Sequence, residues 1–151
     1  MPIIPEKAYA QVESRLKDRW TLLPRAQAAL MMARQAALSP PGQATDGDRA
    51  RPSQPGDRTQ RAAIKLLEAE KRLDEAEKWV EVFRMLDRAF PWETTAEGVA
   101  AGYLYGNGMT QDECCRAMRC SRARLRQLRD NYVGHAALFA ADKGLLRIKE
   151  G

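Results

Sequence analysis

The sequence predicts an all-α protein, in which an N-terminal helical hairpin or coiled-coil unit is followed by a C-terminal helix-turn-helix domain. Apolar residues recur at steps of three and four along two long segments, which is the period of an α-helix. A segment rich in proline and glycine separates these two segments, as expected for a connection between helices. Near the C-terminus, two further helical segments each begin at a residue that favours helix caps, Thr110 and Ser121.

The chain has 151 residues, of which 44% are apolar and 30% are charged. This composition is typical of a folded protein and differs from that of disordered chains and membrane proteins. No apolar run approaches the ~20 residues that cross a bilayer, and the first residues lack the features of a signal peptide. We therefore expect a cytoplasmic protein without a membrane partner, with one domain over 1–90 and a second over 91–151.

The first helical segment runs from about Pro5 to Leu38. Proline inside a helix removes a backbone donor and clashes with the preceding turn, so Pro24 predicts a kink or break near Leu23. Residues 39–56 are small, polar, Pro or Gly and have no apolar period. We expect them to form a flexible loop that is long for a connection within a compact domain.

A second, longer helix is expected to begin near Asp57 or Thr59 and to end near Phe90, because Pro91 stops it. Its apolar positions keep heptad spacing, so they predict a packing seam. The seam either packs antiparallel against the first helix of the same chain or joins two chains, and both hold if two hairpins associate. The seam consists of Leu66, Ala69, Leu73, Ala76, Val80, Phe83 and Phe90, and the oligomerisation candidates among them are Leu66, Leu73, Val80 and Phe83.

The region from Glu93 onward divides into three helices. The first ends at Asn107-Gly108, whose residues tolerate the left-handed conformation. Thr110 caps a short second helix and Glu113 follows three residues later, which is the spacing of a capping box. Ser121 caps the third helix, whose inner side is expected to carry Leu125, Leu128 and Tyr132. Two capped helices joined by a tight turn predict a helix-turn-helix.

Basic charge is concentrated in this motif. The formal net charge is +5, and the six arginines from Arg116 to Arg129 follow one another without an intervening Asp or Glu. A solvated helix face normally includes acidic partners that relieve such repulsion, so the run favours contact with DNA. We expect Arg122, Arg124, Arg126 and Gln127 to read bases, and Thr110, Gln111 and Arg116 to hold phosphates. The full set of DNA-binding candidates is Thr110, Gln111, Arg116, Ser121, Arg122, Arg124, Arg126, Gln127 and Arg129.

The cysteines Cys114, Cys115 and Cys120 lie in the same stretch. Side chains of near-adjacent cysteines on a helix diverge, so we expect reduced thiols rather than a disulfide. A zinc site with His135 lacks any C-x-x-C pair, and neither a metal nor another cofactor is expected. The sequence also has no Ser, His and Asp arrangement and no phosphate-binding glycine loop, so we do not expect an enzyme.

The pattern Tyr-Leu-Tyr-Gly-x-Gly-Met-Thr-Gln-x-Glu, followed by Cys-Ser-Arg, resembles the C-terminal promoter-reading domain of bacterial sigma factors. It is more similar still to the sigma-like phage transcriptional regulators of the RinA and ArpU type. In that family, a stretch similar to residues 56–66 opens the long helix after a variable polar loop. The resemblance implies a regulator of phage or prophage origin that activates late genes. The chain departs from the family at Cys114 and Cys115, where Ile and Ala are more usual, and at Pro24.

These observations predict a sequence-specific transcriptional regulator whose partners are double-stranded DNA and host RNA polymerase. A single helix-turn-helix buries little surface, so we also expect a homo-oligomer, most simply a dimer. One alternative is a small terminase or another DNA-packaging subunit. Another is a protein that binds RNA polymerase or a sigma factor without binding DNA.

Overall fold

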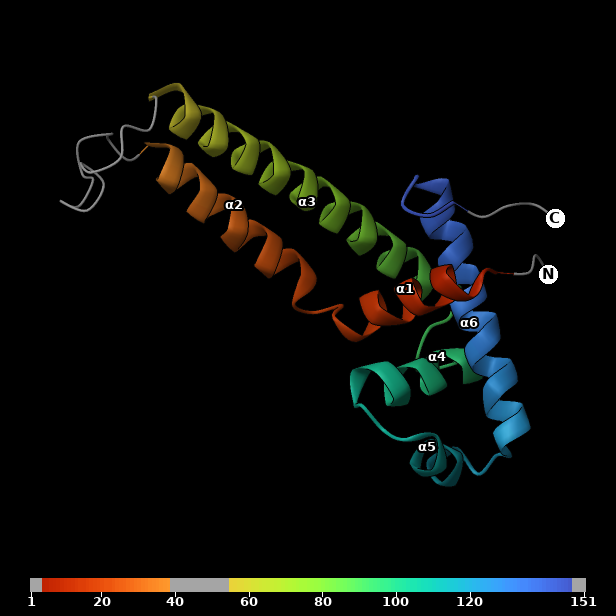
Figure 1. The fold of residues 1–151 in the computed structure, drawn as a ribbon. Coiled ribbons are helices and arrows are strands. Elements are labelled where there is room, and N and C mark those ends of the chain that lie inside the picture. The colour runs from red at the N-terminus through yellow and green to blue at the C-terminus, as the bar shows by residue number, and fades with distance from the viewer. Residues whose placement is uncertain (1–3, 39–54, 148–151) are drawn as a thin grey trace. The chain divides into compact units, whose positions relative to one another are not determined.

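Residues 4–38 and 55–147 are the ranges that the computed structural model describes. Within these ranges there is no β-strand, which confirms the all-α class (Figure 1). None of the helices described there is long and apolar enough to cross a membrane. The helices are α1 (Glu6–Lys17), α2 (Leu22–Leu38), α3 (Pro55–Ala89), α4 (Ala96–Ala101), which continues into a π-helical turn (Gly102–Gly106), α5 (Gln111–Met118) and α6 (Arg122–Asp142).

The chain forms two compact units. Unit 1 comprises Met1–Trp20 and Glu77–Gly151, whereas unit 2 comprises Thr21–Ala76, so that α3 runs through both. This division differs from the expected boundary at residue 90. The apolar faces of α1 and of the last turns of α3 are buried in unit 1, and burial of apolar surface decides which elements belong to one core.

The break in the first predicted helix is confirmed, but it lies earlier than expected. The chain turns at residues 18–21, before Leu23. Pro24 falls in the first turn of α2, where a backbone N–H has no partner within the helix, so proline is tolerated there. The predicted loop at 39–56 lies outside the described residues as far as residue 54, and α3 then begins at Pro55.

Unit 2 is a helical hairpin in which α2 and the first part of α3 run side by side (Figure 1). Its buried side chains are mostly small: Ala26, Leu30, Ala69 and Ala76. Leu66 and Leu73 of the predicted seam are half-buried. Several large apolar side chains of this unit are instead exposed: Met31, Met32, Leu38, Ile64 and Leu67.

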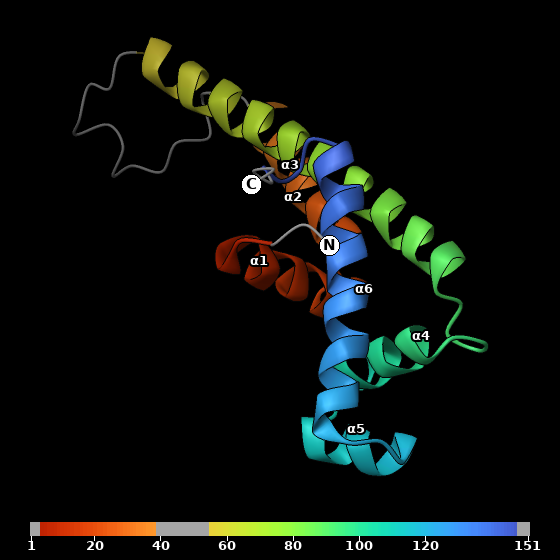
Figure 2. The same cartoon turned by 90° about the vertical axis from the view of Figure 1, so that its right-hand side faces the viewer.

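Helix α6 is the centre of unit 1, and both α1 and α4 lie beside it in two perpendicular views (Figures 1 and 2). One face of α6 is buried along most of its length: Leu125, Leu128, Tyr132, Val133, Ala136, Ala137 and Ala140. Against this core α1 buries residues at a spacing of four, Ala8, Val12 and Leu16.

The last turns of α3 bury a row of side chains in unit 1 that differs from the predicted seam. Trp79, Val82, Phe83 and Leu86 are buried, whereas Val80 is only half-buried. A heptad pattern assumes one helical partner along the whole helix, but α3 contributes to a different core in each unit. Phe83 is 2% exposed within one chain, so its side chain is not available to a second chain in this structure.

The start of α4 is fixed by a close backbone approach. Thr95 caps the helix by accepting a hydrogen bond from the Gly98 N–H at 3.1 Å. A Cβ atom on Gly98 would lie 2.5 Å from the carbonyl oxygen of Phe90 and 2.8 Å from Cα of Trp92. Only glycine leaves room for this contact, which ties α4 to the end of α3.

Candidate nucleic-acid interface

Helices α5 and α6 are joined by three residues, and both begin at the predicted cap. The Thr110 hydroxyl oxygen accepts from the Glu113 N–H at 3.2 Å, and the Ser121 hydroxyl oxygen accepts from the Arg124 N–H at 3.1 Å. The Glu113 carboxylate accepts from the Thr110 hydroxyl at 3.1 Å. In a capping box that carboxylate would accept from the backbone N–H of the cap residue, so the box is replaced by a side-chain pair.

The turn between the two helices is made by a residue in the left-handed conformation. Arg119 has φ 52° and ψ 48°. The chain reverses there, and the Cys120 N–H donates to the carbonyl oxygen of Cys115 at 3.1 Å. Glycine is the usual residue at such a position, so no local pattern indicates that an arginine adopts this conformation.

A small apolar cluster beneath the turn fixes the two helices on each other and on α4. Cys114 is fully buried, and its thiol lies 3.7 Å from the sulfur of Met118. The buried positions predicted for Leu125, Leu128 and Tyr132 on α6 are confirmed. The other members of the cluster are Ala100, Leu125 and Leu128, with Tyr103, Leu104, Cys115, Met118 and Cys120 packed around them.

The exposed face of α6 carries three of the predicted base readers. At 100° per residue, Ala123, Arg126 and Gln127 lie opposite the buried face, with Arg122 and Arg124 on either side. Within residues 4–38 and 55–147, no hydrogen bond or ion pair engages the side chains of Arg124, Arg126 or Gln127. Their donors therefore point to solvent.

Arg122 is engaged inside the protein. Its Nε donates to Oδ1 of Asp112 at 2.9 Å, and its Nη2 donates to the same oxygen. The hydrogen bonds and the charge of Asp112 raise the pKa of Arg122. This exposed pair links the first turn of α5 to the first turn of α6, and no sequence pattern predicts it.

The predicted phosphate contacts lie at the surface of α5. Thr110, Gln111 and Arg116 are exposed, and Nε of Arg116 is 3.5 Å from the backbone oxygen of Asp112. The acidic residues of the first turn, Asp112 and Glu113, lie beside them. Their charges oppose the attraction that a helix N-terminus offers to a phosphate.

Arg129 lies away from this exposed face. Its side chain is 23% exposed, its guanidinium carbon is 5.9 Å from the centre of the Tyr9 ring, and its Nε is 3.9 Å from Oδ1 of Asp130. In the part of the chain that the structure describes, Nε is buried without a hydrogen-bond partner. Arg129 is thus part of the contact between α1 and α6 rather than of the surface formed by Arg124, Arg126 and Gln127.

Two tyrosine hydroxyls complete the contact of α1. The Tyr9 hydroxyl donates to Oδ1 of Asp130 at 2.7 Å, and the Tyr105 hydroxyl donates to Oε2 of Glu13 at 2.8 Å. Burial and these bonds raise the pKa of both tyrosines. Residues 9 and 130 are 121 positions apart, so no local pattern in the sequence pairs them.

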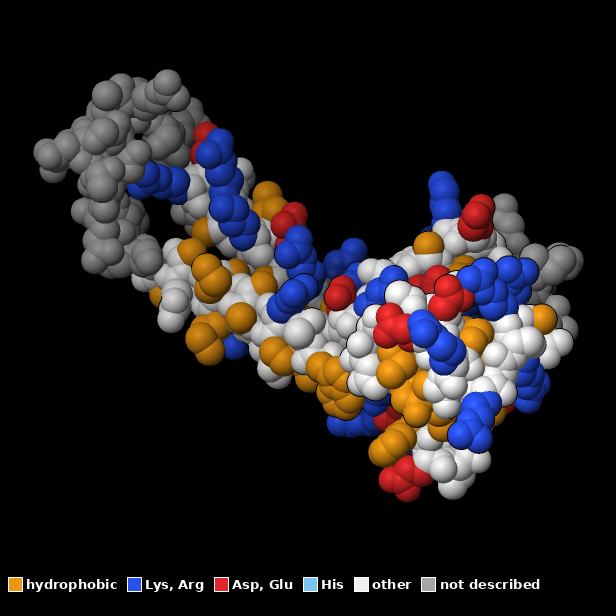
Figure 3. All heavy atoms as spheres, turned by 90° about the horizontal axis from the view of Figure 1, so that it is seen from below, with side chains coloured by type: hydrophobic (Ala, Val, Ile, Leu, Met, Phe, Trp, Pro, Cys, Tyr) orange, Lys and Arg blue, Asp and Glu red, His pale blue; other side chains and the backbone are white. Residues whose placement is uncertain are grey.

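The view from the side on which α5 lies shows basic side chains interspersed with acidic and apolar ones (Figure 3). The face is therefore not one continuous basic surface. Affinity for a polyanion would come from particular arginines at defined positions more than from a general positive field.

The described residues contain no group of three His, Cys, Asp or Glu side chains that would hold a metal ion. His135 is packed edge-on against Phe90 at 5.0 Å, and its Nδ1 is 2.8 Å from the backbone oxygen of Asn131. The three cysteines are free thiols.

The site presents a set of hydrogen-bond donors on the exposed face of α6. Helix α5, which is capped by Thr110, packs against α6 and holds it in place. Guanidinium and amide groups match the acceptors on base edges and phosphates. Comparisons of the chain with models of protein families, with curated proteins and with solved structures find no match.

Proposed function

We propose that this protein is a sequence-specific transcriptional regulator that binds double-stranded DNA, with α5 and α6 acting as a helix-turn-helix. The observation that carries the proposal is the exposed face of α6, on which Arg124, Arg126 and Gln127 have no partner within the described residues. Arginine pairs with guanine through two donors, glutamine pairs with adenine, and the Ala123 methyl group fits against thymine.

The packing supports this role because it orients the exposed face. Cys114, Leu125 and Leu128 bury the opposite side of both helices, so the other face of the first two turns of α6 is turned to solvent. The major groove is about 12 Å wide and admits one α-helix. In this proposed arrangement Thr110, Gln111 and Arg116 contact phosphates of the DNA backbone. Ser121 caps the start of α6, the helix that reads the bases.

Arg122 can contact DNA only after its ion pair with Asp112 is broken. Both side chains are exposed, and exposed ion pairs are weak in water. A phosphate or a guanine edge competes with Asp112 for the same donors. We therefore assign Arg122 to DNA contact as a residue that exchanges partners on binding.

The wider biological role in the proposal is activation of late genes of a phage or prophage, in the cytoplasm of a bacterial host and at its nucleoid. The resemblance of residues 102–129 to sigma-like phage regulators supports it, and it includes host RNA polymerase as a partner. Immunoprecipitation of the protein with its bound DNA, followed by sequencing, tests this role. Recovery of random genomic fragments would contradict it.

The residue-level test compares Arg126→Ala with Arg88→Ala in a DNA-binding assay on the selected operator. Arg88 is an exposed arginine on α3, so its removal costs the same charge outside the interface. Loss of a base contact should weaken operator binding by about 1 to 3 kcal/mol and relax preference at one base pair. If both variants weakened all DNA sequences equally, α6 would not read bases.

A further inference from the structure

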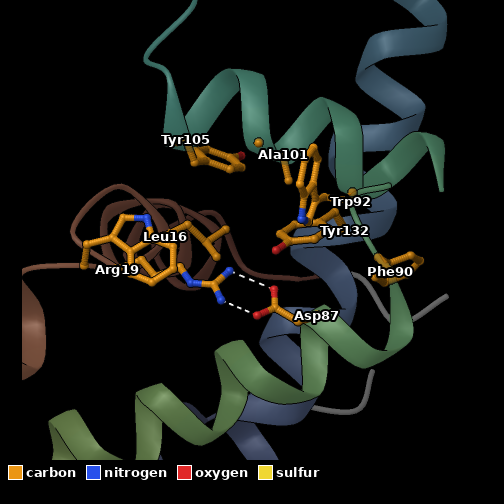
Figure 4. A pocket seen from close by; sticks show the side chains of 12 residues that line it. Leu16, Arg19, Asp87, Phe90, Trp92, Ala101, Tyr105 and Tyr132 are labelled. Carbon is orange, nitrogen blue, oxygen red and sulfur yellow. Dashed lines mark hydrogen bonds and ion pairs between the residues drawn. The ribbon is translucent and has the colours of Figure 1, made fainter. Parts of the chain in front are cut away.

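Unit 1 contains a cavity that the proposed DNA contact does not use. Its volume is about 190 Å³, and its walls come from the end of α1, the end of α3, the α4 segment with its π-helical turn, and α6 (Figure 4). Five of its twelve lining residues are aromatic: Trp20, Phe90, Trp92, Tyr105 and Tyr132.

One polar group of the cavity wall is a hydroxyl that faces the open space. Tyr132 is 5% exposed, and its hydroxyl points into the cavity (Figure 4). Within residues 4–38 and 55–147 this hydroxyl forms no hydrogen bond. Burial raises the pKa of Tyr132 to about 12, so the group is a neutral donor at physiological pH. The hydroxyl is therefore free to donate a hydrogen bond to a ligand in the cavity.

The charged groups of the cavity neutralise each other. Arg19 donates to both carboxylate oxygens of Asp87 (Figure 4). The distance from Nη1 of Arg19 to Oδ1 of Asp87 is 2.9 Å. The Arg19 guanidinium also lies 4.8 Å from the centre of the Trp20 ring. Because this pair is already formed, neither a free cation nor a free anion finds an unpaired opposite charge. The remaining groups are donors, namely the Tyr132 hydroxyl and the Trp92 indole N–H, which is turned toward Tyr132 in Figure 4.

The size and the lining define the ligand. A buried cavity of about 150 Å³ accommodates a benzene ring, so this one fits a single ring with a small substituent. Aromatic walls favour a flat aromatic ring. We propose that this cavity binds a small, uncharged, single-ring aromatic compound that carries a carbonyl group, with the carbonyl oxygen accepting from Tyr132.

The π-helical turn forms part of the cavity wall. Such turns occur frequently at functional sites. Gly102 begins this turn and lines the cavity, and a Cβ atom built on it meets nothing within 4 Å. A larger side chain at position 102, which stands in the wall, has room there and should narrow the cavity.

Benzamide is a suitable probe. Its binding to the full chain, in the absence of DNA, is followed by ligand-detected NMR and by fluorescence of the exposed Trp20 and Trp92. Tyr132→Phe keeps the ring and removes the donor, so affinity should fall about fivefold to tenfold. Gly102→Leu should abolish saturable binding. Tyr103→Phe is the matched control, since Tyr103 does not line this cavity, and should bind as the unmodified protein does.

Benzoate and benzylammonium test the charge argument, and both should bind at least tenfold more weakly than benzamide. Circular dichroism establishes that Gly102→Leu is folded, and Gly102→Ala replaces it if it is not. The proposal is overturned if benzamide shows no saturable binding, or if neither Tyr132→Phe nor the Gly102 variant changes its affinity. Because no DNA is present, this result is independent of the proposed transcriptional role.

Discussion

Arg122 at the start of α6 donates two hydrogen bonds to one carboxylate oxygen of Asp112 at the start of α5. The arginine at the edge of the proposed reading face is thus held by an acid, and under the proposed function DNA would have to displace that acid. Under the proposed function, Asp112 would therefore influence the affinity for DNA, although it contacts no base itself.

Replacing Asp112 with Asn should raise DNA affinity several-fold, because it frees Arg122 and removes a negative charge beside the phosphates. Fluorescence anisotropy on the operator at two salt concentrations measures the effect. Glu93→Gln is the control, since Glu93 is exposed in the same unit and its loss changes net charge equally. Equal gains in the two variants would mean that net charge, and not release of Arg122, explains the result.

The left-handed backbone at Arg119 predicts an unusual order of stabilities. A non-glycine residue in this conformation costs about 1 to 2 kcal/mol, and glycine avoids this cost but has more conformational entropy in the unfolded chain. Arg119→Gly should therefore unfold in urea within about 0.5 kcal/mol of the unmodified protein, whereas Arg119→Val should lose about 1 to 2 kcal/mol. A valine variant as stable as the glycine variant would contradict the left-handed turn.

The same turn brings two cysteines together. The Cys120 N–H donates to the carbonyl oxygen of Cys115 at 3.1 Å, and both side chains pack against the same apolar cluster, although near-adjacent cysteines on one helix were expected to diverge. With oxidised glutathione, the Cys115 thiolate should attack the disulfide and release one glutathione thiolate. The Cys120 thiolate should then attack Cys115 sulfur and release the second, which leaves a disulfide between the two cysteines.

Burial and the neighbouring Cys120 raise the pKa of the Cys115 thiol, so this reaction should be slow at neutral pH and accelerate about tenfold per pH unit below that pKa. Mass spectrometry of tryptic peptides measures it, because cleavage after Arg116 and Arg119 separates the two cysteines. Cys114→Ser should still form the bond, and Cys120→Ser should stop at the mixed disulfide. A bond that includes Cys114 would refute the pairing.

The hydrogen bonds of Tyr9 and Tyr105 at α1 predict a loss of folding stability at alkaline pH. The pKa of Tyr9 is raised by burial and by its bond to Asp130, whereas an unfolded tyrosine ionises near pH 10. Deprotonation then favours the unfolded chain, so stability is complete below about pH 10 and falls as pH rises further. Tyr9→Phe should cost about 0.5 to 1.5 kcal/mol at pH 7 and make the decline above pH 10 shallower.

Urea denaturation between pH 8 and pH 11 checks this expectation. Tyr103→Phe is the comparison, because Tyr103 does not belong to the contact between α1 and α6. If Tyr9→Phe and Tyr103→Phe behaved alike across this range, the Tyr9 hydroxyl would not stabilise the position of α1.

The exposed apolar residues of unit 2 are the candidate contacts of a dimer, so substitutions there should disrupt self-association. Ile64 and Leu67 lie on the face of α3 opposite its buried alanines. Leu67→Glu should lower the mass measured by light scattering and leave the circular dichroism spectrum unchanged. Phe83→Glu should instead unfold unit 1 in part, because Phe83 is buried there. An unmodified protein that stays monomeric at high concentration, with and without DNA, would exclude the dimer.

Local features of the fold were predictable from the sequence. The caps at Thr110 and Ser121, the buried positions of Leu125 and Leu128, and the end of α3 before Pro91 depend on neighbours within a few residues. Contacts between distant segments were not predictable. Arg129 belongs to an arginine run by its sequence, but it packs with Tyr9 because α1 docks on that side of α6. Val80 fits a heptad, yet Trp79 and Val82 are the buried neighbours, because α3 changes its packing partner between the two units.

The same long-range docking has a consequence for how the chain matures on the ribosome. Unit 1 is assembled from the first twenty residues and the last seventy-five, so α1 is made long before the helix it packs on. At about 5 to 20 residues per second, the 121 positions from Tyr9 to Asp130 take on the order of ten seconds to synthesise. During that interval the apolar face of α1, with Val12 and Leu16, lacks α6, the helix at the centre of its core. Truncated chains that end before α6 should therefore be the species that chaperones and proteases recognise first.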